Sequence, residues 1–176
     1  MNKKTRFWVR RVVMLTLIVL IGYALWQGLD TDKKKAPEVG DKAPNFTLKT
    51  LDGKKLTLDD FHGKPVLLNF WASWCKPCEA EMPAIQKVYE KYKDQGFQVV
   101  GVNIAETEVA VSGFTRELAI TFPVVLDRDR VVTKRYDVGR LPATYLIDRN
   151  GKIIRKMKGQ MLEEEVDGYA KEALSK

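Results

Sequence analysis

The two cysteines constrain the fold of this chain most strongly, because they are the only ones in the sequence and stand three residues apart, at Cys75 and Cys78. The nearly continuous apolar run of residues 65–70 precedes them and predicts a strand buried on both faces of a sheet. Residues 75–95 carry apolar side chains at helical spacing, and Gly96 is expected to end that helix. The first cysteine is therefore predicted to lie where a buried strand turns into a helix.

This position predicts a reactive thiol pair. The unpaired N–H groups and the dipole at a helix N-terminus favour a thiolate over a thiol. Each unit by which a thiol pKa falls adds about 1.4 kcal/mol to the relative stability of the anion. We expect Cys75 to attack a disulfide, and Cys78, one helical turn further on, to resolve the mixed disulfide.

Two simpler interpretations of the cysteine pair stay open beside this one. A disulfide between residues so close in sequence constrains the unfolded chain little, which disfavours a purely structural bond. A zinc site needs four ligands, and the chain has one histidine, His62, and no further cysteine. The favoured interpretation is a redox centre without a metal or an organic cofactor.

The rest of the sequence alternates predicted strands and helices. Strands are expected at 45–50, 54–58, 97–105, 124–126, 143–148 and 152–158, and helices at 107–118, 129–136 and 161–174. Asp52-Gly53 and Asn150-Gly151 predict hairpin turns between neighbouring strands. The pattern predicts an α/β domain with a mixed central sheet flanked by helices.

The N-terminal part of the chain has a different character. Val12 to Leu29 are 18 consecutive uncharged residues, which as a helix would reach about 27 Å, close to the thickness of a hydrocarbon core. Five cations precede this stretch, so we expect a transmembrane signal-anchor with its N-terminus in the cytoplasm and the domain outside. A signal peptide cleaved after Ala24 is the alternative.

These patterns divide the chain into four parts. We expect a basic cytoplasmic tail at 1–11, the transmembrane helix at 12–29, a linker at 30–44 and an extracytoplasmic domain at 45–176. The formal net charge is +7, of which residues 1–35 carry +6. The predicted domain therefore has no basic field, and nucleic acid is not expected as a partner.

Several motifs resemble a known family. Residues 70–78 (Phe-Trp-Ala-Ser-Trp-Cys-Lys-Pro-Cys), the Leu141-Pro142 pair and the closing hairpin and helix are similar to thioredoxin-fold oxidoreductases. The resemblance is more specific at residues 40–46 and 67–70 and in the predicted anchor. These features are similar to ResA-like, membrane-anchored thiol-disulfide oxidoreductases of cytochrome c maturation. The resemblance implies a thioredoxin-like fold with an N-terminal β-hairpin and an inserted αβ segment at 106–126, which would help to shape a surface cavity for a partner.

The resemblance also implies which residues meet a substrate. Cys75 and Cys78 match the redox pair of the family. Pro142 matches the cis-proline loop that faces the pair, where the backbone of Leu141 would pair with an extended substrate chain. Trp74 is expected to form part of an apolar rim against which the substrate lies.

An acidic residue is implied beside the redox pair. Asn69 falls where cytoplasmic thioredoxins place a buried acid, and Glu81, on the same helix face as Cys78, is expected to replace that acid and to exchange a proton with the thiol. The alternative is an ordinary solvated glutamate. Lys76, between the cysteines, is expected to stabilise the Cys75 thiolate.

The implied activity is reduction of the disulfide in the haem-binding C-x-x-C-H segment of apocytochrome c. The sequence has no flavin or nicotinamide motif, so the electrons would come from another protein, by family analogy a CcdA-type membrane protein. Three other functions stay open: a general extracytoplasmic disulfide oxidase or isomerase, a thiol peroxidase, and a noncatalytic module that binds apocytochrome c.

Overall fold

The computed structural model describes residues 3–29 and 36–176, and within the first range it describes side chains for residues 6–23. The chain divides into two compact units, Met1–Lys35 and Ala36–Lys176. The described part of the first unit is one helix, α1 (Lys3–Leu29). Among the described residues no helix is both long and apolar enough to cross a membrane, so the predicted membrane span is not confirmed.

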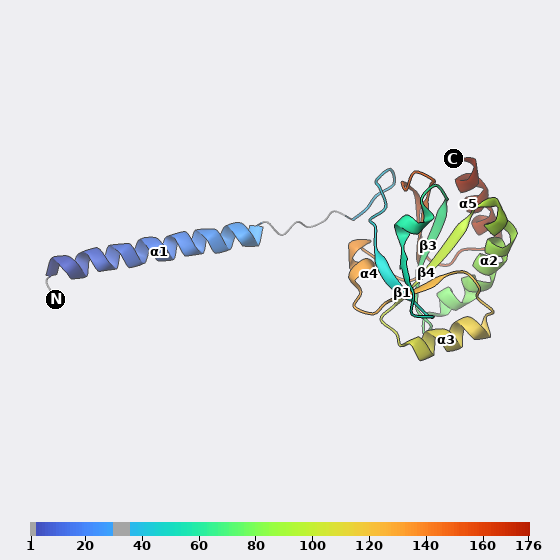
Figure 1. Ribbon diagram of the computed structural model, residues 1–176, viewed down its shortest axis with the longest axis horizontal. Coiled ribbons are helices and arrows are strands. Elements are labelled where there is room, and N and C mark those ends of the chain that lie inside the picture. The colour runs from blue at the N-terminus through green and yellow to red at the C-terminus, as the bar shows by residue number, and fades with distance from the viewer. Residues whose placement is uncertain (1–2, 30–35) are drawn as a thin grey trace. The chain divides into compact units, whose positions relative to one another are not determined.

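The second unit is built on one mixed sheet of seven strands (Figure 1). The strands are β1 (Thr47–Thr50), β2 (Lys55–Thr57), β3 (Val66–Trp71), β4 (Gln98–Ile104), β5 (Val124–Asp127), β6 (Ala143–Ile147) and β7 (Ile153–Lys158). Their order across the sheet is β2-β1-β5-β4-β3-β6-β7. β3, β4 and β5 are parallel, and the other neighbours are antiparallel. The predicted mixed sheet is confirmed, with β3 in its interior.

Helices and the N-terminal segment of the unit cover the two faces of the sheet. The helices are α2 (Lys76–Tyr92), α3 (Glu108–Glu117), α4 (Val131–Arg135) and α5 (Glu163–Ser175), with short 3-10 turns at Leu58–Phe61 and Lys93–Gln95. Side chains of α2, α3 and α5 enter the core on one face, and those of α4 enter the core on the other. This arrangement is the α/β sandwich that the sequence predicts.

β3 shows why the apolar run before the cysteines is nearly continuous. All residues of Val66–Trp71 are buried. Successive side chains of a strand point to opposite faces, so Leu67 and Trp71 join the core beneath α2 while Leu68 and Phe70 join the core on the other face. A strand covered on both faces has no exposed position, and its sequence therefore lacks polar alternation.

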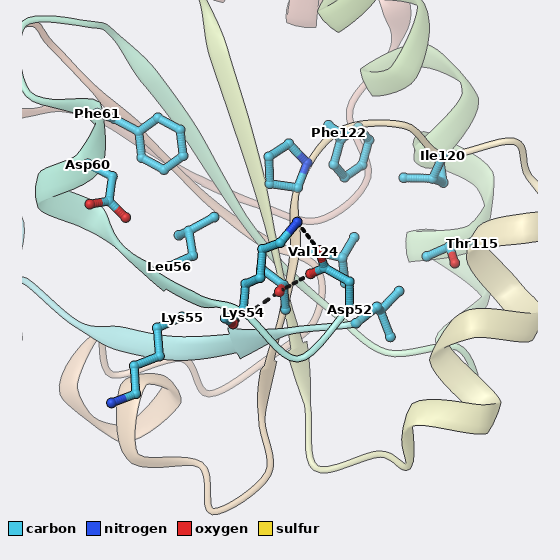
Figure 2. Close-up of a pocket in the computed structure, with 13 residues that line it drawn as sticks. Asp52, Lys54, Lys55, Leu56, Asp60, Phe61, Thr115, Ile120, Phe122 and Val124 are labelled. Carbon is cyan, nitrogen blue, oxygen red and sulfur yellow. Dashed lines mark hydrogen bonds and ion pairs between the residues drawn. The ribbon is translucent and has the colours of Figure 1, made fainter.

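A hollow of about 450 Å³ opens beside the N-terminal hairpin (Figure 2). Apolar side chains such as Leu56 and Phe122 line it, and the ion pair of Lys54 with Asp52, 2.7 Å long, lies at its edge. Part of the inserted segment, from Thr115 to Val124, contributes to the lining. The hollow lies at the N-terminal end of β5, whereas the cysteines follow the C-terminal end of the parallel strand β3. Neither cysteine contributes to its lining.

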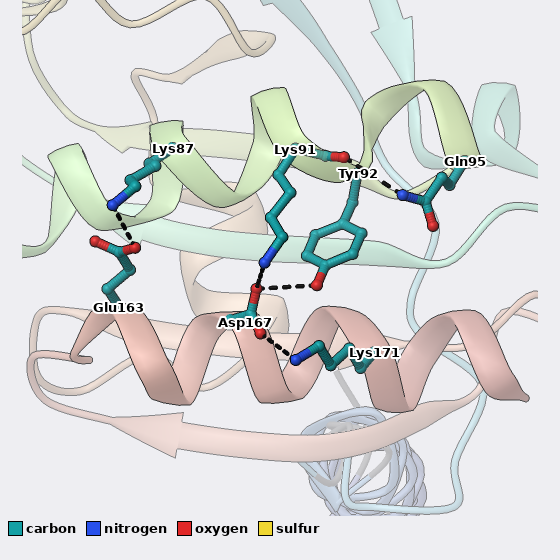
Figure 3. Close-up of polar contacts among 7 residues, drawn as sticks. All are labelled: Lys87, Lys91, Tyr92, Gln95, Glu163, Asp167 and Lys171. Atoms are coloured by element: carbon teal, nitrogen blue, oxygen red, sulfur yellow. Dashed lines mark hydrogen bonds and ion pairs between the residues drawn. The ribbon is translucent and has the colours of Figure 1, made fainter.

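Polar contacts hold α2 against α5 at the surface (Figure 3). The carboxylate of Asp167 accepts hydrogen bonds from Lys91 Nζ at 2.6 Å and from the Tyr92 hydroxyl at 2.9 Å, and it pairs with Lys171 at 2.7 Å. The bonds from Lys171 and Lys91 hold the pKa of Asp167 well below its usual range. These contacts fix α5 beside the helix that carries the cysteines.

The folded unit begins earlier than the predicted boundary. Residues 30–35 of the expected linker (30–44) lie outside the described residues. The remainder, 36–44, lies along the C-terminal hairpin: the Ala43 N–H donates to the Gly151 carbonyl at 2.8 Å, and Ala43 is buried. Backbone hydrogen bonds to the hairpin order this segment. Its composition, with proline and glycine, is that of a linker and does not predict these bonds.

Candidate active site

The two cysteines lie at the start of α2, directly after the turn that leaves β3. Cys75 is the N-cap residue of α2, and its backbone N–H donates to the Ala72 carbonyl at 3.1 Å. The cysteines form a disulfide, with their Cα atoms 5.3 Å apart. Cys75 is 6% exposed, whereas Cys78 is completely buried. Cys75 is therefore the sulfur that another protein reaches first.

The start of α2 provides a favourable environment for an anionic sulfur. α2 has 17 residues, so its dipole and its first-turn amides favour negative charge on Cys75 once the disulfide is reduced. Pro77 lies in this first turn, where a missing N–H costs no helical bond. The Lys76 ammonium is exposed and pairs with Glu79 at 2.9 Å. This pairing reduces the net charge that Lys76 offers to the Cys75 sulfur.

Glu81 is fully buried in α2, one helical turn after Cys78. Its Oε1 atom accepts a hydrogen bond from Asn69 Nδ2 at 2.8 Å, and its Oε2 atom accepts one from the Met161 N–H at 3.0 Å. Burial raises the pKa of Glu81 to about 7, against the lowering effect of these two hydrogen bonds. The alternative of a solvated glutamate is therefore wrong.

Asn69 is the one polar residue of β3, and the same cluster explains its presence there. Besides the bond to Glu81, its Nδ2 atom donates to Thr144 Oγ1 at 2.9 Å. Thr144 lies directly opposite Asn69 in the antiparallel pairing of β3 with β6. The strand thus supplies an amide that holds the carboxylate of Glu81 in place from beneath α2.

The loop before β6 comes alongside the cysteine turn. Its Leu141–Pro142 peptide bond is cis, as the resemblance implies. Ala143 pairs with Phe70, so Pro142 lies next to the end of β3 from which the cysteine turn departs. Leu141 packs against the core cluster that contains both cysteines, and the Pro142 carbonyl accepts a hydrogen bond from the Gly159 N–H at 2.9 Å.

Trp71, at the end of β3, and Trp74, in the turn that follows, have different environments. Trp74, next to Cys75, is 69% exposed. Trp71 is buried, and its ring stacks on Phe114 with centroids 4.7 Å apart. Trp74 therefore offers an apolar ring to a partner, whereas Trp71 belongs to the core.

The structure shows a polar network behind the cysteine turn that the sequence patterns do not predict. Glu106 accepts hydrogen bonds from the Ser73 N–H at 2.7 Å and from Asn103 Nδ2 at 2.6 Å. Only the position of Glu106 in the sequence could have indicated this network. Glu106 follows the buried strand β4, which is parallel to β3, and the carboxyl ends of parallel neighbours meet at one edge of the sheet.

In the part of the chain that the structure describes, no group of three or more His, Cys, Asp or Glu side chains could hold a metal ion. The chemistry that this arrangement supports is exchange between the Cys75–Cys78 disulfide and the thiols or disulfides of another molecule.

Known proteins with similar sequences and structures share this chemistry. Residues 39–156 match the family model described as AhpC/TSA family. The chain is 42% identical over 167 residues to the thiol-disulfide oxidoreductase ResA of a Bacillus cereus strain, covering 95% of this chain and 96% of that protein. It is 41% identical over 169 residues to ResA of Bacillus subtilis (strain 168), covering 96% of this chain and 94% of that protein. The chain also matches the crystal structure of a thiol:disulfide interchange protein, a thioredoxin family protein from Chlorobium tepidum TLS, with a TM-score of 0.71 and 26% sequence identity. This match covers 79% of this chain and 99% of that one.

Proposed function

Because this chain belongs to the AhpC/TSA family, as one of its ResA-type thiol-disulfide oxidoreductases, we propose that it is a reductase for the disulfide in the haem-binding C-x-x-C-H segment of apocytochrome c. Both thiols of that segment must be free before haem can attach. The observation that carries the proposal is the redox pair itself: Cys75 caps α2 and keeps an exposed fraction of 6%, and the completely buried Cys78 lies one turn from the buried Glu81.

The reaction starts from the dithiol form of the enzyme. The Cys75 thiolate attacks one sulfur of the substrate disulfide, which forms a mixed disulfide and releases the other substrate sulfur as a thiolate. Cys78 then gives up its proton and attacks the Cys75 sulfur, which breaks the mixed disulfide and releases the second substrate sulfur. Two electrons pass to the substrate, and the enzyme is left with the Cys75–Cys78 disulfide.

Glu81 is suited to the proton transfer in the second step. With a pKa of about 7, it is present in both protonation states near neutral pH. Its carboxylate form repels a nearby thiolate and so keeps Cys78 protonated until the mixed disulfide forms. The same carboxylate then accepts the proton that Cys78 loses, as expected for a general base.

The surface around Cys75 suits an extended polypeptide. We assign Leu141 and Pro142 to the loop that pairs with the substrate backbone, since this loop lies beside the end of β3. Trp74, at 69% exposure, would cover apolar side chains of the same segment. The substrate disulfide is thereby placed over Cys75.

The oxidised enzyme has to be reduced again after each turnover. The sequence contains no flavin or nicotinamide motif, so we assign this step to another protein, a CcdA-type membrane protein that passes on a pair of electrons. A thiol-disulfide exchange in the reverse direction restores the Cys75 and Cys78 thiols.

We place the enzyme at the outer face of the cell membrane, held by residues 12–29. This assignment rests on the 18 uncharged residues of that segment and on the five cations before it. The full-length protein is expected to stay with membranes after alkaline extraction, and protease added to intact protoplasts is expected to remove the domain. A mature protein that begins after Ala24 would contradict the anchor.

A Cys78→Ala variant tests the substrate. Without the resolving thiol, Cys75 is expected to remain joined to its substrate in a mixed disulfide, which mass spectrometry identifies after acid quenching of cells. Cys75→Ala is the control and should trap nothing, because Cys78 is buried. Capture of other proteins without apocytochrome c would refute the substrate assignment, while the thiol-disulfide exchange activity would stand.

The reduction potential tests the direction of the reaction, because the same geometry can also form disulfides. Equilibration with glutathione buffers of known composition gives the potential, and about 30 mV corresponds to about 1.4 kcal/mol. A reductase requires a potential well below that of strong protein oxidants, which lie at about −120 mV. A value in that oxidising range would contradict the proposed direction.

A further inference from the structure

Glu106 connects the cysteine turn to the neighbouring strand. The Ser73 N–H donates to Oε2 of Glu106 at 2.7 Å, and the Ser73 hydroxyl donates to Oε1 at 2.5 Å. Asn103 Nδ2 donates to Oε2 at 2.6 Å. One carboxylate thus accepts three hydrogen bonds, two from Ser73 in the cysteine turn and one from Asn103 near the end of β4.

The local backbone directs Glu106 toward the turn. Ala105 has a φ of +56°, in the left-handed region that residues other than glycine seldom adopt. Its N–H donates to the Asp127 carbonyl of β5 at 3.2 Å. Asn103 is fully buried and lies opposite Trp71, the last residue of β3. The end of β4 is therefore bent, and the residue after the bend meets the turn that leaves β3.

The turn held by Glu106 determines how Cys75 sits on α2. The Cys75 N–H donates to the Ala72 carbonyl at 3.1 Å, and the Cys75 carbonyl accepts the first helical bond, from Glu79 N–H at 3.0 Å. Ser73 lies inside this turn, so a displacement of Ser73 changes the orientation of the N-cap. The amides at a helix start stabilise an anionic sulfur only when the sulfur lies close to them.

We propose that Glu106 is a positioning residue of the redox centre, whose carboxylate holds the Ser73 turn in the conformation that places the Cys75 sulfur over the amides of α2. The inference rests on the proposed role of Cys75 as the attacking thiol. It gives Glu106 neither a substrate contact nor a proton-transfer step. The redox pair accordingly depends on the hydrogen-bonding geometry at position 106 and not on the negative charge there.

Two substitutions separate geometry from charge. In Glu106→Gln, the amide oxygen can accept from the Ser73 N–H and from Asn103 Nδ2, which share one oxygen in the parent. The amide nitrogen can donate to the Ser73 hydroxyl, which then acts as the acceptor. Glu106→Ala loses all three bonds. Glu108→Ala is the matched control, since Glu108 is exposed and pairs with Arg128 at 2.7 Å.

The experiment measures the rate of alkylation of the reduced, full-length protein by iodoacetamide from pH 5 to pH 10. Glu106→Ala is expected to raise the midpoint of the profile by about one pH unit, so that alkylation at pH 6 is about ten-fold slower. At a pH above both midpoints, its equilibrium with glutathione is expected to shift by about the same factor toward the protein disulfide, because the thiolate of the reduced form is less stable. Glu106→Gln and Glu108→Ala are expected to stay within about two-fold of the parent.

A Glu106→Ala profile that coincides with the parent profile would overturn the inference. A Glu106→Gln profile shifted as far as that of Glu106→Ala would also overturn it, because the effect would then belong to the charge. Near-ultraviolet circular dichroism shows whether Glu106→Ala folds. If it does not, Ser73→Ala is the deciding variant, because it removes the bond to Oε1 of Glu106 alone and should slow alkylation about three-fold. An unchanged rate for Ser73→Ala would refute the positioning role of Glu106. Failure of the proposed role of Cys75 as the attacking thiol would instead appear in the parent, whose Cys75 would titrate like free cysteine.

Discussion

Replacing Glu81 by glutamine removes a buried titrating group beside the redox pair while keeping its size. In the folded protein burial raises the pKa of Glu81 to about 7, compared with an ordinary value of 4.5. Between these two pH values the folded chain binds a proton that the unfolded chain does not. The free energy of unfolding must therefore fall as the pH rises through this window.

The size of the effect follows from the displacement of the pKa. A difference of about 2.5 units corresponds to on the order of 3 kcal/mol, which is fully present below about pH 4.5 and lost by about pH 7. The variant Glu81→Gln has no such dependence. Its amide nitrogen would face the Met161 N–H in place of an acceptor oxygen, at a cost of about 1–3 kcal/mol at every pH. The variant is thus less stable than the parent at pH 5 and equals or exceeds it at pH 8.

Urea unfolding of the oxidised unit 36–176 at pH 5, 6, 7 and 8 measures this difference. The parent and the variant are compared at each pH, so that contributions from other titrating groups cancel, and the disulfide keeps both cysteines from titrating. Glu79→Gln, at an exposed position of the same helix, is the control and should show a constant difference. A constant difference for Glu81→Gln as well would refute the burial argument for this residue.

Three further predictions concern packing and the surface. Gly101→Ala is expected to lower the free energy of unfolding by about 1–3 kcal/mol, because its Cβ would lie 2.9 Å from Trp71 Nε1; urea unfolding measures this. Trp74→Ala is expected to leave stability within about 0.5 kcal/mol but to slow reduction of a disulfide-bonded peptide more than reduction of glutathione disulfide, as measured by stopped-flow kinetics. Asp167→Asn is expected to cost about 0.5–1 kcal/mol at pH 7. Because the pKa of Asp167 is lowered on folding, this difference should begin to shrink below about pH 4 and should vanish only as the pH falls through the lowered pKa of the folded state.

Each of these predictions has a contrary outcome. Unchanged stability of Gly101→Ala would mean that the sheet relaxes around the added methyl group. Equal slowing on both substrates for Trp74→Ala would exclude a contact specific to polypeptides. A pH-independent difference for Asp167→Asn would show that the carboxylate charge does not stabilise the contact between α2 and α5.

The main elements of the fold could be predicted from the sequence because burial leaves a periodic signal. The apolar run at 65–70 corresponds to β3, and Gly96 ends the helical region with a φ of +98°. The folded start of the unit could not be predicted in this way. Residues 36–44 are ordered by hydrogen bonds to the distant C-terminal hairpin, and their composition is that of a linker.

The site could be predicted only where its residues are close in sequence or recognisable by resemblance. Cys75 and Cys78 share one short motif, and the resemblance points to Glu81. Glu106 contacts Ser73 across 33 positions in the chain, and no local pattern reports such a pairing. The partnership depends on strands β3 and β4 being parallel neighbours, which the three-dimensional arrangement reveals.

Partial alkylation distinguishes a Cys75 thiol activated at the start of α2 from an ordinary thiol. The reduced parent protein is treated with less than one equivalent of iodoacetamide over a range of pH, and peptide mass spectrometry assigns the label. If the start of α2 activates Cys75, the label falls almost entirely on Cys75, with a midpoint below about 8.5, the pKa of free cysteine. Equal labelling of Cys75 and Cys78, with an ordinary thiol midpoint, would show that Cys75 is not activated.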